Sequence, residues 1–483
     1  MFHFKAIVRI VGMLLLLETG MMLLCSLVSL YYQDEALTDF WLSALVTAVA
    51  GAALARIGWG SERRLTRREG YVVVSLTWVA FSLFGMLPFL ISGYIPRVED
   101  AFFEAMSGFT GTGATILDDI ERLPHGLLFW RSMTQWVGGL GIIMFTIAVL
   151  PIFGVSGLQV FAAEASGLAR DKVTPRIGET ARWLWSIYFG MTLVLFFLLW
   201  AGGMGPFDSV CHSFTTMSTG GLSTHQDSIA YFHSPFIEYV IILFMFLSGI
   251  NYTLLLVLLR GRVRKVWSDR ELRWYCASVA VFIVAFTAIL LHSGSGDFEE
   301  TFRKALFQVV SIHTSTGYAT DDYMLWPPVA WGLVLVMMIS GACAGSTSGG
   351  MKCIRLVILF RVMKNEFRRI VHPNAVLPVR LGRQVVPQSI VSVVLAFSTI
   401  YVAITIASIL FMLAMGMGFE EAVGCSISSV SNMGPGLGQT GPAHSWSCLP
   451  VPCKCLCSLL MLMGRLELFT ILLLFTRDFW KKS

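Results

Sequence analysis

Long apolar stretches alternate with short polar ones along the whole chain. A helix needs about 20 mainly apolar residues to cross the hydrocarbon core of a bilayer. Ten stretches meet this length, at residues 7–31, 37–58, 71–93, 127–153, 183–203, 236–259, 274–292, 329–360, 389–416 and 456–476. The pattern predicts an all-α integral membrane protein with ten transmembrane helices and both termini on the same side of the membrane.

Four of the connections between these stretches contain a hydroxyl-rich segment that runs into a glycine. Aligned without gaps, the segments share that glycine, with a hydroxyl residue three positions before it and another six positions before it. Each segment follows a stretch of roughly ten residues, which suits a short helix but not a crossing. The segments are 101–116, 209–224, 305–320 and 422–437, and the shared glycines are Gly113, Gly221, Gly317 and Gly434.

This arrangement predicts four tandem repeats of helix, pore loop and helix around one pseudo-fourfold pore, with two extra N-terminal helices. The expected divisions are 1–70 for the two extra helices and a basic loop, 71–175 for the first repeat, 176–270 for the second, 271–383 for the third and 384–483 for the fourth. The third repeat contains a glycine-rich run, 341–350, that interrupts the eighth apolar stretch.

Composition and charge support a membrane protein and predict its orientation. The chain of 483 residues is 55% hydrophobic and only 13% charged, whereas soluble chains carry about 25% charged residues. The first apolar stretch is too long for a signal peptide, so we expect it to be retained. The basic clusters fall on the N-terminal side, which the positive-inside rule makes cytoplasmic. They are Arg63, Arg64, Arg67 and Arg68, then Arg260, Arg262, Arg264 and Lys265, then Arg361, Lys364, Arg368 and Arg369, and finally Arg477, Lys481 and Lys482.

The chemistry of the glycine segments indicates a filter for a monovalent cation. Non-helical backbone is tolerated at membrane depth only where protein or a water-filled cavity satisfies it. Glycine allows positive φ, so successive carbonyls can face one axis, and a short helix directs its negative end toward that axis. Stretches 110–113, 218–221, 314–317 and 431–434 contain no carboxylate, and the hydroxyls offer neutral oxygens or helix-end partners. Close helix packing is the alternative for any one segment, but four segments in register disfavour it.

Several longer motifs resemble the Trk/Ktr/HKT superfamily, specifically the membrane subunits of bacterial Trk potassium uptake systems, the TrkH/TrkG type. The similarity extends over essentially the whole chain. The motifs are QWVGGLGIIMF at 135–145, GGLSTH at 220–225, STGYATD at 315–321, GACAGSTSGGMKCIR at 341–355, VHPNA at 371–375, NMGPGLG at 432–438 and GRLELF at 464–469.

The resemblance implies potassium uptake across the inner membrane, with potassium as the transported ion and no organic cofactor in this chain. It also implies a homodimer, contacts with membrane lipids and a cytosolic nucleotide-binding regulatory subunit of the TrkA type, without nucleic-acid binding. Glycine rather than serine at Gly113 favours potassium over sodium. Backbone carbonyls of eight residues would coordinate the ion: Thr112, Gly113, Gly220, Gly221, Thr316, Gly317, Met433 and Gly434.

The resemblance also implies a gate below the filter, formed by two features of the chain. The run at 341–350 would be a loop inside the membrane, whose gating residues are Gly345, Ser346, Thr347, Gly349 and Gly350. A hinge or packing kink is the alternative. Arg465 lies in the last apolar stretch, where a charge is costly and usually faces a cavity, so it would repel cations from the pore. The alternative is a structural ion pair, though Glu467, two residues on, points elsewhere on a helix. Lys352 would snorkel to the cytoplasmic face.

The remaining chemistry-bearing residues favour structural roles. We expect Arg131 to be an anchor near the outer boundary, and His212 and His313 to be structural rather than proton-coupling groups. Cysteines 448, 453, 455 and 457 lack zinc-site spacing, and segment 444–457 departs from the family pattern. No catalytic dyad is evident, so an enzyme is not expected. The alternative function is a proton-coupled potassium symporter with alternating access, which four repeats of one orientation disfavour.

Overall fold

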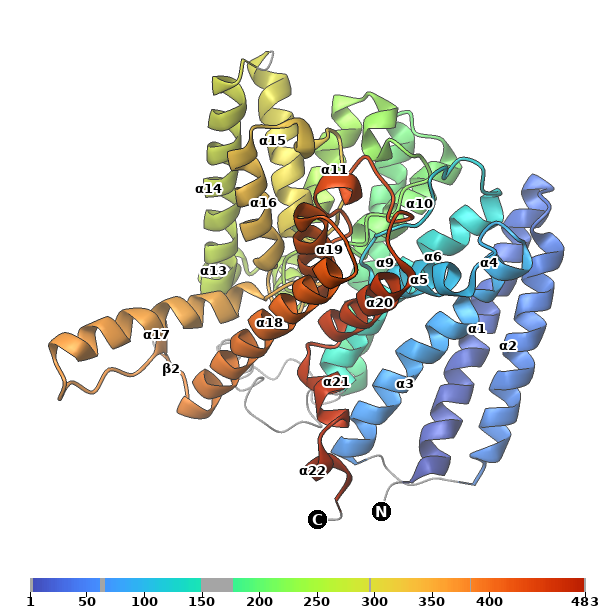
Figure 1. Cartoon of the computed structure of the whole chain (residues 1–483), viewed down its shortest axis with the longest axis horizontal. Coiled ribbons are helices and arrows are strands. Elements are labelled where there is room, and N and C mark those ends of the chain that lie inside the picture. Colours follow the sequence, from blue (N-terminus) through green and yellow to red (C-terminus); the bar gives the residue numbers. More distant parts are fainter. Residues whose placement is uncertain (1–2, 61–65, 149–176, 295–296, 383, 482–483) are drawn as a thin grey trace.

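The computed structural model describes residues 3–60, 66–148, 177–294, 297–382 and 384–481, and most of these residues are helical (Figure 1). The strands in this part of the chain are a small antiparallel pair, β1 (Arg380–Leu381) and β2 (Gln384–Val385). The two termini lie at the same end of the molecule in Figure 1. The predicted all-α class is therefore confirmed.

Six helices are long and apolar enough to cross a membrane, within the part of the chain that the structure describes. They are α1 (Phe4–Tyr32), α2 (Leu37–Ile57), α3 (Arg67–Gly85) continued by α4 (Leu87–Ile91), α9 (Ile177–Ala201), α14 (Arg270–His292) and α18 (Gln388–Ala414). A seventh is obtained if α11 (Pro235–Ser248) and α12 (Tyr252–Leu259) count as one span, although they are bent by 106°.

The other predicted spans are interrupted or only partly described. The fourth corresponds to α6 (His125–Ala148), and residues 149–153 lie outside the described ranges. The eighth is broken between α16 (Pro328–Ile339) and α17 (Cys353–Val371), and α17 projects sideways from the bundle (Figure 1). The tenth, expected to be continuous, breaks between α20 (Val451–Arg465) and α21 (Phe469–Leu474), where Glu467 and Leu468 both have positive φ.

Four short helices end at the four glycine segments. They are α5 (Val98–Thr110), α10 (Pro206–Met217), α15 (Phe298–His313) and α19 (Phe419–Ser431). Each has at least one acidic residue in its first turn, where a negative charge stabilises the helix dipole. Their packing is cyclic, because α5 contacts α20, α10 contacts α6, α15 contacts α11 and α19 contacts α16.

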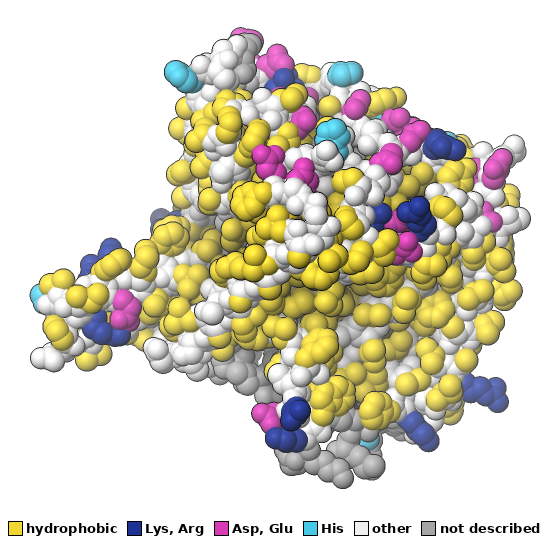
Figure 2. Space-filling view, in the orientation of Figure 1, with side chains coloured by type: hydrophobic (Ala, Val, Ile, Leu, Met, Phe, Trp, Pro, Cys, Tyr) yellow, Lys and Arg dark blue, Asp and Glu magenta, His cyan; other side chains and the backbone are white. Residues whose placement is uncertain are grey.

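The remaining elements connect or flank these helices. The N-terminal pair α1 and α2 pack together, and α1 also contacts α3 and α6. Short connecting helices are α13 (Val263–Trp267), α22 (Arg477–Trp480), η1 (Ser228–Phe232), η2 (Tyr323–Leu325) and η3 (Gly438–Thr440). Hydrophobic side chains cover most of the face in Figure 2, while acidic side chains gather at its top. Lys and Arg are prominent near the end that carries the termini and on α17, as expected for a multi-pass membrane protein.

Candidate functional site

Each glycine segment leaves its short helix through the same backbone turn. The residue two positions before the shared glycine is left-handed, with φ of 66° at Gly111, 54° at Thr219, 55° at Ser315 and 52° at Asn432. The following N–H donates to the carbonyl five residues back, over 2.8 to 3.1 Å. These bonds are Thr112 to Ser107, Gly220 to Thr215, Thr316 to Ser311 and Met433 to Ser428. This is the Schellman helix ending, repeated four times.

The four shared glycines form a closed ring of contacts. All have positive φ, between 76° and 99°. A Cβ atom on each would overlap or crowd a carbonyl oxygen of another segment: Gly113 meets Gly220, Gly221 meets Thr316, Gly317 meets Met433 and Gly434 meets Thr112 at 2.7 Å. The structure therefore brings all eight predicted coordinating residues together, and it does so in chain order around a cycle.

The hydroxyl residues three positions before the shared glycines lie at the C-terminal ends of the short helices. Thr110 and Thr314 each donate to a carbonyl four residues back at 2.7 Å, and Ser218 donates to the carbonyl of Thr215 at 3.1 Å. Ser431 instead shares a 2.7 Å hydrogen bond with the hydroxyl of Tyr401. These side chains serve as helix-end partners, so the oxygens left to line the ring are backbone carbonyls.

A cavity with an empty volume of about 530 Å³ lies over one side of the ring, and all four shared glycines line it. No carboxylate is among its described lining residues. Arg131 lines it as well, and the expectation that Arg131 is a boundary anchor is wrong. This side chain is 1% exposed and pairs at 2.8 Å with Glu104, which is also buried. Arg131 also donates to the carbonyl of Ser223, just beyond Gly221.

The other side of the ring is covered by the loop between α16 and α17. The N–H of Gly349 donates to the hydroxyl of Ser315 at 2.5 Å, and the hydroxyls of Thr219 and Thr347 are 3.3 Å apart. Arg465 donates to the carbonyls of Thr347 at 2.9 Å and Gly138 at 2.8 Å, as a buried side chain at the end of α20. Its guanidinium also lies 3.7 Å from where a Cβ of Gly111 would be. The loop between α16 and α17 and the side chain of Arg465 thus contact the left-handed residues on this side of the ring.

Both ends of the loop are fixed to neighbouring helices. Gly345 has φ of 76°, and its carbonyl accepts a hydrogen bond from the N–H of Tyr252, at the bend between α11 and α12. Ser346 donates to the carbonyl of Cys343, and Gly350 has φ of 70°. A carboxylate oxygen of Glu271 accepts hydrogen bonds from the N–H groups of Ala344 and Ile354. The loop between α16 and α17 therefore covers this side of the ring in a conformation that these hydrogen bonds fix.

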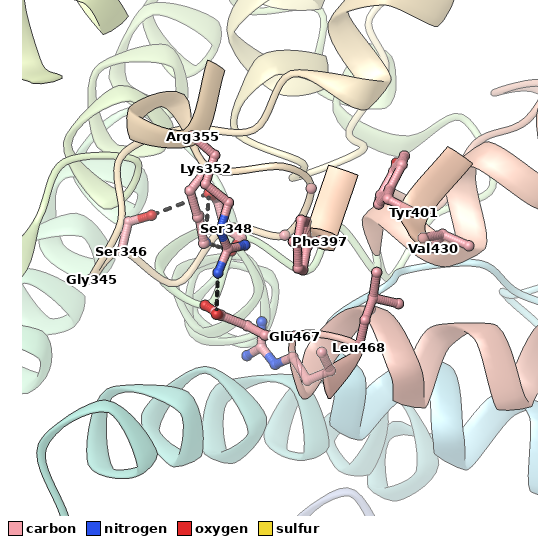
Figure 3. A pocket seen from close by; sticks show the side chains of 14 residues that line it. Gly345, Ser346, Ser348, Lys352, Arg355, Phe397, Tyr401, Val430, Glu467 and Leu468 are labelled. Carbon is pink, nitrogen blue, oxygen red and sulfur yellow. Dashed lines mark hydrogen bonds and ion pairs between the residues drawn. The ribbon is translucent and has the colours of Figure 1, made fainter. Parts of the chain in front are cut away.

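Charged residues line a cavity beside this loop, with an empty volume of about 510 Å³ (Figure 3). Glu467 pairs with Arg355 at 2.5 Å rather than with Arg465, and it lies in the break after α20 rather than on a helix. Lys352 does not extend to a surface: it is buried and donates to the carbonyl of Ser348 within the loop, which corrects the expected snorkelling.

The two histidines of the short helices and most of the cysteines are buried. His212 is buried and hydrogen-bonded to the Asp208 carbonyl and the Ser223 hydroxyl, and His313 is buried beside the Ser278 hydroxyl at 3.0 Å. All ten cysteines are free thiols. The described residues contain no group of three His, Cys, Asp or Glu side chains placed to hold a metal ion.

Sequence reasoning missed three buried groups at this site: the pair of Glu104 and Arg131, Glu271 under the loop, and Gln135 beside Gly220. Gln135 opens a motif quoted above, which could have singled it out. The only sequence signal for Glu271 is its position as an acidic residue in the first turn of an apolar helix. The ion pair joins residues 27 apart, and no local pattern links them.

Comparison with known proteins gives matches over nearly the whole chain. The family model TrkH, described as a cation transport protein, matches residues 34–482. The Trk system potassium uptake protein TrkH of Salmonella typhimurium is 42% identical, covering 99% of this chain and all of that protein. TrkG of Escherichia coli K12 is 34% identical over 99% of each chain. The crystal structure of the potassium transporter TrkH from Vibrio parahaemolyticus superposes with a TM-score of 0.92 at 36% identity, covering 99% of this chain and all of that one.

Proposed function

This chain belongs to the TrkH family of cation transport proteins, and we propose that it takes up potassium through the ring formed by its four glycine segments. The protein is a multi-pass membrane protein, and its relatives are transporters rather than enzymes. The eight carbonyl-bearing residues predicted from the sequence, from Thr112 to Gly434, are its proposed potassium ligands.

The closed cycle of glycine-to-carbonyl contacts is the observation that carries this proposal. Four segments from one chain, each with the same helix ending and the same φ pattern, surround one axis. Carbonyl rings of this kind replace the hydration shell of a potassium ion in channel filters. The cyclic packing of α5, α10, α15 and α19 supports four tandem repeats around a pseudo-fourfold pore.

The chemistry around the ring favours a monovalent cation. Each short helix ends at the ring, so its partial negative charge is directed there, while the cavity above has no carboxylate lining. Calcium sites prefer several carboxylate oxygens, so neutral carbonyls suit potassium better.

The loop at 341–350 and Arg465 form the proposed gate. The parts of the glycine segments that form the ring, 112–113, 220–221, 316–317 and 433–434, are called its first to fourth strands, although they are not β-strands. The loop and Arg465 contact Thr219, Ser315 and Gly111, each the residue before one of these strands, and a buried guanidinium there opposes a cation by like charge. We further propose that a cytosolic TrkA-type subunit moves this gate, that the protein is a homodimer, and that both termini are cytoplasmic in the inner membrane. The names of the relatives refer to a Trk system, which supports a multi-component assembly.

Proton-coupled symport remains the second candidate, and one buried acid favours it. Glu18 lies in α1, is fully buried, and neither carboxylate oxygen has a hydrogen-bond partner among the described residues. An ionisable residue inside the membrane commonly marks an ion or proton pathway. If Glu18 carries protons, Glu18→Gln should remove the dependence of potassium uptake on external pH. Uptake with unchanged pH dependence would leave Glu18 a structural residue.

Ion uptake into cells that lack their own potassium systems tests the main proposal. Cells producing this chain, with a Trk regulatory subunit co-expressed, should grow at low potassium and accumulate rubidium. Cells producing Gly221→Val are the control, because any side chain there overlaps the carbonyl of Thr316. Equal growth and rubidium content in both strains and in cells with an empty vector would refute potassium uptake.

A further inference from the structure

The side chain of Gln135 hydrogen-bonds the two residues that flank Gly221, the shared glycine of the second strand. The side chain comes from α6 and is fully buried. Its Nε2 donates to the carbonyl of Gly220 at 2.7 Å, and its Oε1 accepts from the N–H of Leu222 at 3.1 Å. One partner is an acceptor and the other a donor, so only one orientation of the carboxamide satisfies both.

The carboxamide of Gln135 occupies the space that a side chain fills in other strands. A Cβ atom on Gly220 would overlap the Cδ and Oε1 atoms of Gln135. The equivalent residues in the first and third strands are threonines, whose hydroxyls bond Thr110 and Thr314 at 2.8 Å. In the second strand, Gln135 of α6 therefore supplies the polar side chain that Thr112 and Thr316 supply themselves in the first and third strands. Gly220 has no positive φ, so this contact, rather than backbone conformation, explains the glycine.

The hydrogen bond to Gly220 makes one carbonyl of the ring unlike the other three. Among the described residues, the carbonyls of Thr112, Thr316 and Met433 accept no hydrogen bond, whereas that of Gly220 accepts one from Gln135. A carbonyl held in this way is less free to move inward around an ion smaller than potassium. Sodium binding would require that movement or leave the ion under-coordinated.

We propose that Gln135 is a positioning residue that fixes the second strand and thereby sets the preference for potassium over sodium. The inference rests on the proposed function, because it takes the ring to be the filter. Gln135 acts through Gly220 and need not touch the ion itself. A role in packing alone would affect folding but leave the selectivity ratio unchanged.

The first test compares Gln135→Leu with Gln308→Leu in purified protein reconstituted into liposomes. Gln308 is a matched control, since it is a buried glutamine on α15 whose Nε2 donates to the Asp321 carbonyl at 2.9 Å, away from the ring. A neutral hydrogen bond contributes about 0.5–1.5 kcal/mol, so Gln135→Leu should lower the rubidium-to-sodium uptake ratio roughly 3- to 10-fold. Gln308→Leu should lower thermal stability alone.

A second test uses the exchange of side chains between α6 and the strand. Gly220→Thr alone should abolish rubidium uptake, because the new Cβ overlaps Gln135. The double variant Gln135→Ala with Gly220→Thr creates the arrangement of the first and third strands and should recover uptake, but with a rubidium-to-sodium ratio below that of the wild type, because nothing then holds the carbonyl of residue 220. This ratio tests the inference even if Gln135→Leu does not fold.

The outcomes separate this inference from the proposed function. Wild-type liposomes that take up no rubidium would count against the filter itself. If wild-type liposomes do take up rubidium, any of three results overturns the inference. Gln135→Leu keeps the wild-type ratio, the double variant is no better than Gly220→Thr alone, or the double variant recovers uptake with the wild-type ratio.

Discussion

At the scale of single residues, the ring depends on backbone conformations that most side chains resist. Glycine adopts positive φ without penalty, but Thr219, Ser315 and Asn432 are not glycine and are left-handed nonetheless. Such strain costs about 1–3 kcal/mol per residue and persists where the surroundings enforce it, commonly at functional sites. The Schellman bonds and the loop contacts supply that enforcement here.

Gly113→Ser should reduce selectivity for potassium over sodium and lower potassium uptake. The serine Cβ would overlap the carbonyl of Gly220, and φ of 83° is unfavourable for serine, so the first and second strands must separate. Sodium and rubidium uptake measured in the same cells gives the ratio. Gly190→Ser is the control, because nothing lies within 4 Å of a Cβ at Gly190. An unchanged ratio in Gly113→Ser would argue against a filter at this glycine.

At the scale of elements, the geometry of the ring and its surroundings comes from interrupted helices. The sequence predicted some of these interruptions and missed others. The apolar pattern indicated the glycine segments and the interruption at 341–350, because glycine and hydroxyl residues stand out against apolar surroundings. It did not indicate the break between α20 and α21, because one charged residue, Glu467, in an apolar stretch does not reveal the positive φ of Glu467 and Leu468. It also missed Gln135 and Glu271, whose partners are backbone groups distant in sequence.

Arg465→Ala should raise potassium leak in the absence of the regulatory subunit. The change removes a buried positive charge beside the ring and two hydrogen bonds, of which one anchors the loop at Thr347. Rubidium efflux from loaded liposomes measures the leak, and roughly a tenfold rise is expected for a barrier lowered by about 1.4 kcal/mol. Arg477→Ala, in α22 beyond the last apolar helix, serves as the control. Efflux equal to wild type would remove Arg465 from the gate.

At the scale of the whole molecule, one buried ion pair joins two of the glycine segments. Glu104 on α5 pairs with Arg131 on α6, and Arg131 also reaches the second strand at Ser223. Glu104 further accepts hydrogen bonds from the hydroxyl of Thr115 and the N–H of Ile116. One buried pair therefore connects the first and second glycine segments beside the ring.

Breaking the pair of Glu104 and Arg131 on one side should destabilise the protein more than removing both charges. Loss of one partner leaves an uncompensated buried charge, which costs about 3–5 kcal/mol. Arg131→Met should therefore lower the melting temperature in detergent strongly, and adding Glu104→Gln should restore part of it. Thermal unfolding of Arg131→Met, of Glu104→Gln and of the double variant gives the coupling energy between the two side chains. Simple additivity of the two effects would mean that the pair does not stabilise the fold.

The contact between Gly434 and Thr112 has a consequence for the order in which the protein forms. Asn432 reinforces it by donating to the Thr112 hydroxyl at 3.0 Å, across 320 positions of sequence. During synthesis the first three strands can meet in succession as they emerge, because each next neighbour follows it in the chain. The first strand acquires its last neighbour only when the fourth glycine segment has been made. A chain terminated before α19 would thus contain three of the four helix endings and an open ring that lacks the contact between Gly434 and Thr112.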